Sequence, residues 1–184
     1  MKYCEQIEDL GVTFQRSLQF TDHIYEIINK SFSLMGLISR NFKDMTKDSF
    51  VLLYMALVRS KLEYAGNVWS TWKKIEIEAI ERFQKRATKM VNECRGLKYE
   101  DRLKLLKIPC LRYRRLRGDL IMVFNMIQKK EEYRCFPILK KHEDRRTRGH
   151  IFKLETQRFN SNARKFFFTN RVTAIWNSLP DEIV

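Results

Sequence analysis

Apolar positions in residues 21–42 recur with the spacing of a helix. One side of a 3.6-residue turn would carry Ile24, Ile27, Ile28, Ser31, Met35, Ile38 and Phe42. Thr21 or Asp22 can supply the oxygen that caps the first turn. The pattern therefore predicts an amphipathic helix with this side buried.

A second helix is predicted over residues 50–69, "FVLLYMALVRSKLEYAGNVW", where apolar residues occupy nearly every angle around the axis. Thr46 or Asp48 in the preceding segment can cap it. A helix that is apolar all round is buried on several sides. We expect it to be the central rod of a helical bundle.

A third helix, over about residues 75–92, has an apolar side and a basic side. The apolar side holds Ile80, Phe83, Ala87, Met90 and Val91, and the basic side holds Arg82, Lys85, Arg86 and Lys89. Glu78 and Glu81 lie four residues before the first two cations, so ion pairs of Glu78 with Arg82 and of Glu81 with Lys85 are expected. The other two cations have no such local partner.

Residues 96–130 predict a short helix, "YEDRLKLLKI", ended by Pro109, and then a long helix that begins with "LRYRRLRGDL". The apolar side of the long helix is predicted to hold Tyr113, Leu116, Leu120, Val123, Phe124 and Ile127. Its four arginines are Arg112, Arg114, Arg115 and Arg117. Two of them, Arg112 and Arg117, border the apolar side, and Arg115 can pair with Asp119. Arg114 has the least local compensation, and we expect it to be the most available for a ligand.

The two ends of the chain are less regular. "EDLGVTF" predicts one strand, which pairs either with another early segment or with a partner outside this sequence. Residues 131–150 are charged and predict a linker, with the basic residues Lys140, Lys141, Arg145, Arg146 and Arg148. Residues 151–184 are rich in aromatic side chains and predict a helix around residues 171–177 that Pro180 stops. The fold class expected is mainly α, a helical bundle with one or two short N-terminal strands and a basic helical extension.

The charge of the chain is unevenly distributed. The net charge is +14, yet residues 1–64 contain eight basic and eight acidic side chains, and residues 65–184 contain 28 and 14. An excess confined to one region, in three basic clusters, favours a nucleic-acid partner. An acidic protein is the main alternative, a solvated surface needs no partner, and a membrane surface is less favoured because no broad apolar stripe accompanies the charge.

Catalytic and metal-binding patterns are weak in this sequence. His23, His142 and His150 are far apart, and a zinc site of Cys135, His142 and His150 would have unusual spacing and lack a fourth ligand. The acidic pair Glu100 and Asp101 suits the first turn of a helix better than a two-metal centre, and Asp181 with Glu182 lacks further ligands. We therefore predict no catalytic residue, no metal and no cofactor for this chain. No apolar run is long enough for a membrane helix and no secretory signal is visible, which favours an intracellular protein, nuclear or cytoplasmic.

Six segments in order resemble one family. "DLGVTFQRSLQFTDHI", "LYMALVRSKLEYAGNVWS", "IEAIERFQKRATKMV", "YEDRLKLLKIPCLRYRRLRGDL", "RTRGHIFKL" and "WNSLPDEIV" are similar to the region after the catalytic palm in reverse transcriptases of jockey-like non-LTR retrotransposons. The resemblance covers residues 9–184, and "LVRSKLEYAGNVW" is its most distinctive block.

The resemblance implies a fragment of an RNA-directed DNA polymerase that uses Mg²⁺ in its palm. Residues 1–20 would be a remnant of the last palm strands, 21–95 a three-helix thumb, 96–130 a basic extension, and 151–184 a truncated C-terminal segment. The thumb would grip the backbone of a template-primer duplex through Arg82, Lys85, Arg86, Lys89, Arg112, Arg114, Arg115 and Arg117. Fingers and palm are missing, so this chain alone is predicted to be inactive. Tyr64 and Trp69 are interpreted as core residues rather than as platforms for bases.

Two other interpretations stay open from the sequence. The chain could be a free-standing helical interaction module, a domesticated remnant of such an element, whose basic face meets an acidic protein. It could also be the product of a decayed element with no present function.

Overall fold

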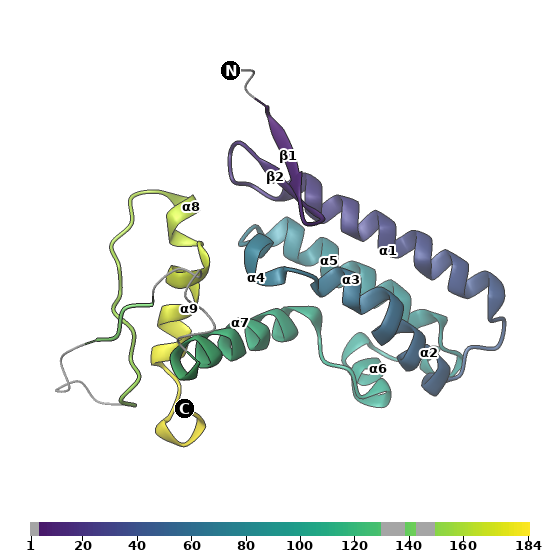
Figure 1. Ribbon diagram of the computed structural model, residues 1–184. Coiled ribbons are helices and arrows are strands. Elements are labelled where there is room, and N and C mark those ends of the chain that lie inside the picture. The colour runs from purple at the N-terminus through teal and green to yellow at the C-terminus, as the bar shows by residue number, and fades with distance from the viewer. Residues whose placement is uncertain (1–3, 130–138, 143–149) are drawn as a thin grey trace. The chain divides into compact units, whose positions relative to one another are not determined.

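The computed structural model describes residues 4–129, 139–142 and 150–184. It confirms the predicted mainly helical fold, with two short antiparallel strands near the N-terminal end (Figure 1). The chain divides into two compact units, Met1–Arg115 and Leu116–Val184. Each unit has a hydrophobic core of its own. Most of the predicted charged linker, residues 131–150, lies outside the described residues.

The first unit begins with a hairpin rather than with a single strand. Strand β1 (Gln6–Asp9) pairs antiparallel with β2 (Val12–Gln15), and Asp9 faces Val12 across the turn. Leu10 and Gly11 connect the strands with φ angles of 47° and 77°, as a tight two-residue hairpin turn requires. The run "EDLGVTF" was expected to be one strand, whereas the turn lies inside it and divides it between β1 and β2. The pairing with another early segment, one of the two alternatives left open by the sequence, is confirmed.

Helix α1 (Thr21–Asn41) buries the predicted side, apart from its last member. Ile24, Ile27, Ile28, Ser31, Met35 and Ile38 are buried, whereas Phe42 is 47% exposed beyond the end of the helix. The predicted cap was wrong: Phe20 occupies the capping position, and no side chain caps the helix. The hydroxyl of Thr21 instead donates to Oε1 of the buried Glu76, at 2.6 Å.

The second helical segment contains a stretch of π-helix. It comprises α2 (Lys47–Leu53), the π-helical η1 (Tyr54–Arg59) and α3 (Ser60–Glu63), and Thr46 caps it as predicted by accepting a hydrogen bond from the amide of Ser49. The buried residues are Phe50, Tyr54, Val58 and Leu62, spaced four apart. In a regular α-helix that spacing would drift by about 40° at each step. The wider turn of a π-helix reduces the drift and keeps the four side chains on one side.

The expectation that this segment is buried on several sides was wrong. Leu52 is 70% exposed and Leu57 is 45% exposed, so apolar side chains also cover its outer surface. The tyrosine and tryptophan that follow differ from each other. Trp69 at the end of α4 (Gly66–Trp69) is fully buried, as predicted, while Tyr64 is 55% exposed and donates its hydroxyl to the carbonyl of Leu10.

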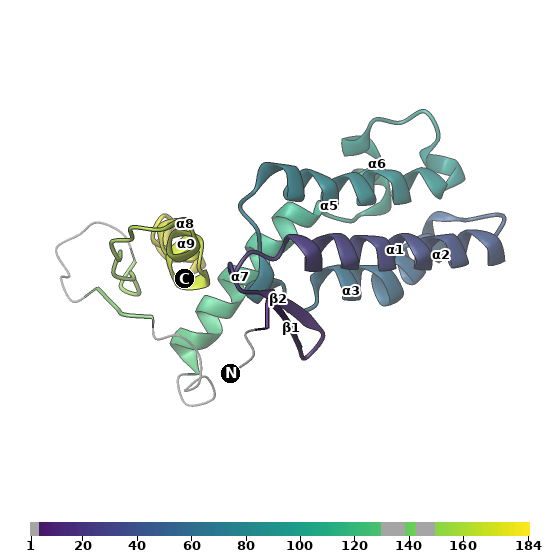
Figure 2. The same ribbon diagram turned by 90° about the horizontal axis from the view of Figure 1, so that it is seen from above.

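The rest of the first unit closes around α5. Helix α5 (Lys74–Ala87) packs against α1 and continues through the short turns η2 (Thr88–Met90) and η3 (Asn92–Cys94) to α6 (Tyr99–Leu106) (Figure 2). Leu106, Ile108 and Leu111 lie in the same core as α1 and α5. Residues 96–111, which the sequence assigned to an extension, thus contribute to the core of the first unit.

The second unit is built from most of α7 (Leu111–Gln128), α8 (Asn162–Lys165), α9 (Phe168–Asn177) and η4 (Asp181–Ile183). Its core includes Val123, Leu154, Val172 and Trp176. The predicted C-terminal helix is confirmed as α9, which ends before Pro180. The apolar side predicted for α7 was partly wrong, because Tyr113, Leu116 and Phe124 are exposed while Asp119 and Met126 are buried.

Candidate nucleic-acid interface

Helix α5 places four cations in one row on its exposed side. Ile80, Phe83 and Ala87 are buried, which fixes the rotation of the helix about its axis. The opposite side carries Arg82, Lys85, Arg86 and, in η2, Lys89, all of them exposed. Their spacing of three, one and three residues keeps them within about a 100° sector. We call these four residues the basic stripe.

Aromatic rings on two neighbouring helices support the centre of the basic stripe. The ammonium of Lys85 lies 5.3 Å from the ring centroid of Tyr99 in α6. The guanidinium of Arg86 lies 5.5 Å from the ring centroid of Phe32 in α1, and Phe32 in turn meets Phe83 edge-on. A cation over an aromatic face is attracted to the ring and still offers its outer side to solvent. Both cations are therefore oriented without being neutralised.

The carboxylates expected to neutralise the basic stripe are used elsewhere. Glu78 pairs with Lys74 at 3.8 Å, and Glu81 accepts hydrogen bonds from the hydroxyl of Tyr99 and from the amide of Arg112. The predicted pairs with Arg82 and Lys85 were wrong for this reason. Among the residues that the structure describes, none makes an ion pair with a cation of the stripe.

A buried polar network holds α6 against α5 behind the basic stripe. Tyr54 donates its hydroxyl to Oε1 of Gln84 at 2.7 Å, and Nε2 of Gln84 lies 3.1 Å from both the hydroxyl of Tyr99 and the carbonyl of Pro109. Burial, together with the hydrogen bond to Glu81, raises the pKa of Tyr99. Its hydroxyl stays protonated and remains a donor to Glu81, so the carboxylate is kept away from Lys85.

Arg102 belongs to the support of the basic stripe and not to its surface. Its side chain is buried, lies over the ring of Tyr99, and donates from Nη1 to the carbonyl of Lys85 at 2.9 Å. A cation at that place stabilises the carbonyl end of α5. The sequence pattern does not reveal these roles of Arg102, Tyr99 and Phe32, because their contacts join separate helices.

Arg114 is engaged within the protein. Its Nε and Nη2 donate to the two carboxylate oxygens of Glu63 at 2.6 and 2.9 Å, and the hydrogen bond to Glu63 raises the pKa of the guanidinium. The expectation that Arg114 is the least compensated arginine of its cluster was wrong, because the partner comes from α3 rather than from its own helix. Arg112, in contrast, is exposed, and only its amide is bonded to Glu81.

The remaining two arginines of this cluster lie at the boundary between the two units. Arg115 is partly exposed at the end of the first unit, and Arg117 is exposed in the second unit. The buried Asp119 of α7 forms a bidentate pair with Arg171 at 2.9 and 3.0 Å. The described residues thus bring together only part of the predicted set, namely the four cations of α5 and η2.

The third predicted cluster is described only at its start. Lys141 lies over the ring of Phe152, 4.9 Å from its centroid, whereas Arg145, Arg146 and Arg148 lie outside the described residues. Cys135 of the unfavoured zinc set lies outside them too. His150 is buried, and its Nε2 lies 2.9 Å from the carbonyl oxygen of Trp176, while its buried Nδ1 has no hydrogen-bond partner among the described residues.

The acidic candidates have structural positions. Glu100 and Asp101 lie in the first turn of α6, where Asp101 pairs with Lys104 at 3.8 Å, and Asp181 and Glu182 lie in η4. Within residues 4–129, 139–142 and 150–184, no three side chains of the metal-ligating types converge. No helix in the same residues is long and apolar enough to cross a membrane.

Comparisons of the chain with protein-family models, curated proteins and solved structures gave no match. The function is therefore inferred from the surface of the chain. Chemically, the basic stripe offers long cations that aromatic rings orient. Such a row can contact successive phosphates of a nucleic-acid backbone and has little means of reading sequence.

Proposed function

We propose that this chain binds the sugar-phosphate backbone of nucleic acid through the basic stripe of α5 and η2, as the thumb and C-terminal part of a reverse transcriptase of the non-LTR retrotransposon kind. The observation that carries the binding proposal is the row formed by Arg82, Lys85, Arg86 and Lys89, which is exposed and makes no ion pair with any described residue. The resemblance of the sequence supports the more specific assignment. Arg112, exposed at the start of α7, extends the candidate set within the first unit.

The form of the ligand follows from the charge and its support. Arginine and lysine heads held over Phe32 and Tyr99 suit phosphates spaced along a strand. The natural ligand would be an RNA–DNA template-primer duplex, bound without regard to sequence. Polymerisation would need the Mg²⁺-binding palm of the parent enzyme. None of the residues named in this proposal belongs to that palm.

The proposal is tested by the salt dependence of binding. The probe is a fluorescein-labelled RNA–DNA duplex, and its anisotropy is titrated with the full chain at several salt concentrations. Each phosphate contact contributes about 0.9 to the slope of log K against log salt. The variant R82Q/K85Q/R86Q/K89Q should therefore reduce the magnitude of the slope by about 3 to 4.

A matched variant distinguishes binding by the basic stripe from binding by the net charge of the chain. R40Q/K43Q/K61Q/R95Q removes four exposed cations of the same unit from other places and should leave most of the affinity in place. Equal losses for the two variants would overturn the assignment to the stripe, because they would show binding by net charge alone. A slope near zero for the unsubstituted chain would overturn nucleic-acid binding altogether.

A further inference from the structure

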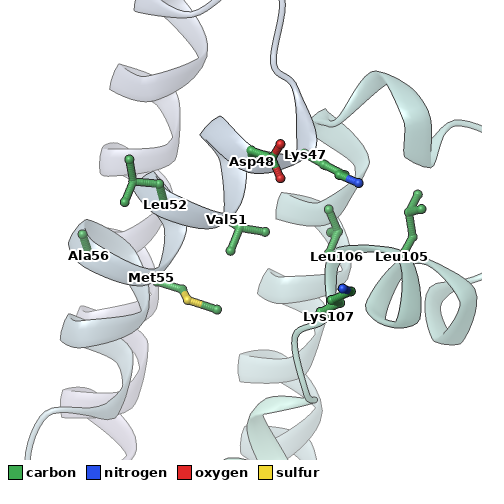
Figure 3. A pocket seen from close by; sticks show the side chains of 9 residues that line it. All are labelled: Lys47, Asp48, Val51, Leu52, Met55, Ala56, Leu105, Leu106 and Lys107. Carbon is green, nitrogen blue, oxygen red and sulfur yellow. The ribbon is translucent and has the colours of Figure 1, made fainter.

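The first unit has an apolar groove that the basic stripe does not use. It lies between α2 with η1 on one side and α6 on the other, and its volume is about 660 Å³. Figure 3 shows Val51 and Met55 directed from the first pair of elements toward Leu106 of α6. A volume of this size falls in the range of about 300–1,000 Å³ that is typical of ligand sites.

The sides of the groove expose large apolar side chains. Leu52 is 70% exposed on α2, and Leu105 is 37% exposed on α6. Covering these leucines with apolar atoms would remove apolar surface from water, which is favourable. An apolar groove with such sides is a surface on which a partner gains free energy by contact.

The π-helical segment contributes to the shape of the groove. Met55 and Ala56 of η1 line it, next to Val51 of α2. Ala56 leaves room there, and a methionine side chain adapts to the shape of what it contacts. An apolar groove between two helices can bind the apolar face of a third helix, as in other helix-in-groove complexes.

The charges around the groove select the kind of helix. Lys47 and Lys107 line it together with a single acid, Asp48, and the two lysines belong to different elements. Lys107 follows the end of α6 with a φ of 52°, a left-handed conformation that a glycine would adopt more easily. The excess of positive charge favours a partner with carboxylates beside its apolar residues.

We propose that this groove binds an acidic amphipathic helix of another protein, with leucine-like side chains in the apolar channel and carboxylates near Lys47 and Lys107. None of the four cations of the basic stripe lines the groove. The inference therefore goes beyond the proposed nucleic-acid binding and does not depend on it. It would allow the chain to hold a protein partner and a nucleic acid at the same time.

The test uses a designed peptide and the full chain. The probe is a fluorescein-labelled helical peptide of about 18 residues, since shorter helices are marginal in water. It has leucines on one side and glutamates at both borders of that side. A second peptide keeps the glutamates and replaces the leucines with serine. We expect the first peptide to bind with micromolar affinity and the second at least about tenfold more weakly.

Two single substitutions locate the site. L52Q should weaken binding of the leucine peptide at least about fivefold, whereas L57Q, on the same helix but outside the groove, should leave it unchanged. Both residues are exposed, so both variants should keep the folded structure. The double variant K47Q/K107N removes the electrostatic attraction between the two lysines and the glutamates of the peptide. Because salt screens this attraction, the variant should weaken binding most at low salt.

Several results would overturn the proposal. They are the absence of binding, equal binding of the two peptides, and equal effects of L52Q and L57Q. Self-association of the free chain that L52Q abolishes would make a second copy the occupant instead. L52Q should leave duplex binding intact, so a failure here is distinguishable from a failure of the basic stripe.

Discussion

Arg114 grips Glu63 with two hydrogen bonds, although the two residues are 51 positions apart in the sequence. The bonds measure 2.6 and 2.9 Å, and the side chains are 29% and 22% exposed. Arg59 lies 3.9 Å from the same carboxylate. The pair joins the start of α7 to the end of α3 within the first unit. The arginine that looked most available in the sequence therefore acts as a tie between two helices.

Arg114→Ala should lower the free energy of unfolding by about 1–3 kcal/mol, because it leaves a partly buried carboxylate without its main partner. Urea denaturation of the full chain, monitored by circular dichroism, measures the loss. Arg112→Ala is the matched control. Its side chain is exposed and makes no described ion pair, so it should change the free energy by no more than about 0.5 kcal/mol.

A double-mutant cycle separates the ion pair from the loss of packing. Glu63→Ala and Arg114→Ala together should cost less than the sum of the two single losses, because each removes the other's partner. Additive losses would contradict a direct coupling. In duplex binding, Arg114→Ala should have a smaller effect than loss of the basic stripe.

Tyr54→Phe should destabilise the first unit by about 1–3 kcal/mol. The substitution removes the hydroxyl that donates to Oε1 of Gln84, whose side chain is 1% exposed, and leaves a buried acceptor without this donor. Tyr64→Phe is the control, since its hydroxyl bonds the carbonyl of Leu10 at an exposed place. Equal effects of the two substitutions in urea denaturation would mean that the buried network contributes little.

His23 should make stability depend on pH. Burial lowers the pKa of His23 below its ordinary value of 6.5, against the raising influence of Glu26 and Glu8 and with a lowering one from Lys30. Because the folded pKa is depressed for a base, the stability that neutral His23 contributes is complete above about pH 6.5 and is lost as the pH falls toward the folded value. Thr13 donates its amide to Nδ1 at 3.3 Å, which fits the neutral ring.

The measurement compares unfolding of the unsubstituted chain and of His23→Gln between about pH 7 and pH 5. The unsubstituted chain should lose more free energy across this window than the variant, which has no proton to gain at position 23. Titration of the His23 ring signals by NMR reports the folded pKa directly. A folded value above 6.5, or equal losses for the two proteins, would contradict the role given to burial.

The helices of this fold could be predicted from the sequence because their signals are local. Six of the seven residues proposed for the buried side of α1 are buried, and Thr46 caps α2 as expected. Thr21 does not cap α1 because the capping position is Phe20, and the hydroxyl of Thr21 donates a hydrogen bond to Glu76 of another helix. The hairpin was missed because a leucine occupies the first turn position, where asparagine or glycine is the usual signal.

The candidate site could be predicted in position but not in its contacts. The basic side of α5 follows from helical spacing, since its apolar residues turn the cations outward. The ring contacts of Lys85 and Arg86 and the use of Glu81 by Tyr99 join separate elements, so no spacing within one helix reveals them. The groove was not predicted either, because Leu52 and Leu105 had no visible reason to be exposed.

The π-helical segment Tyr54–Arg59 determines the angle around the helix axis at which the following residues of the same helical segment lie. A turn of π-helix holds more residues than a turn of α-helix, so each residue after it lies at a different angle from the one a continuous α-helix would give. Leu62 reaches the core and Glu63 reaches Arg114 only with this offset. These contacts therefore constrain the number of residues between Phe50 and Glu63 as well as the residue types in that interval. Proteins that shared this helical bundle would have to keep that interval free of single-residue insertions and deletions.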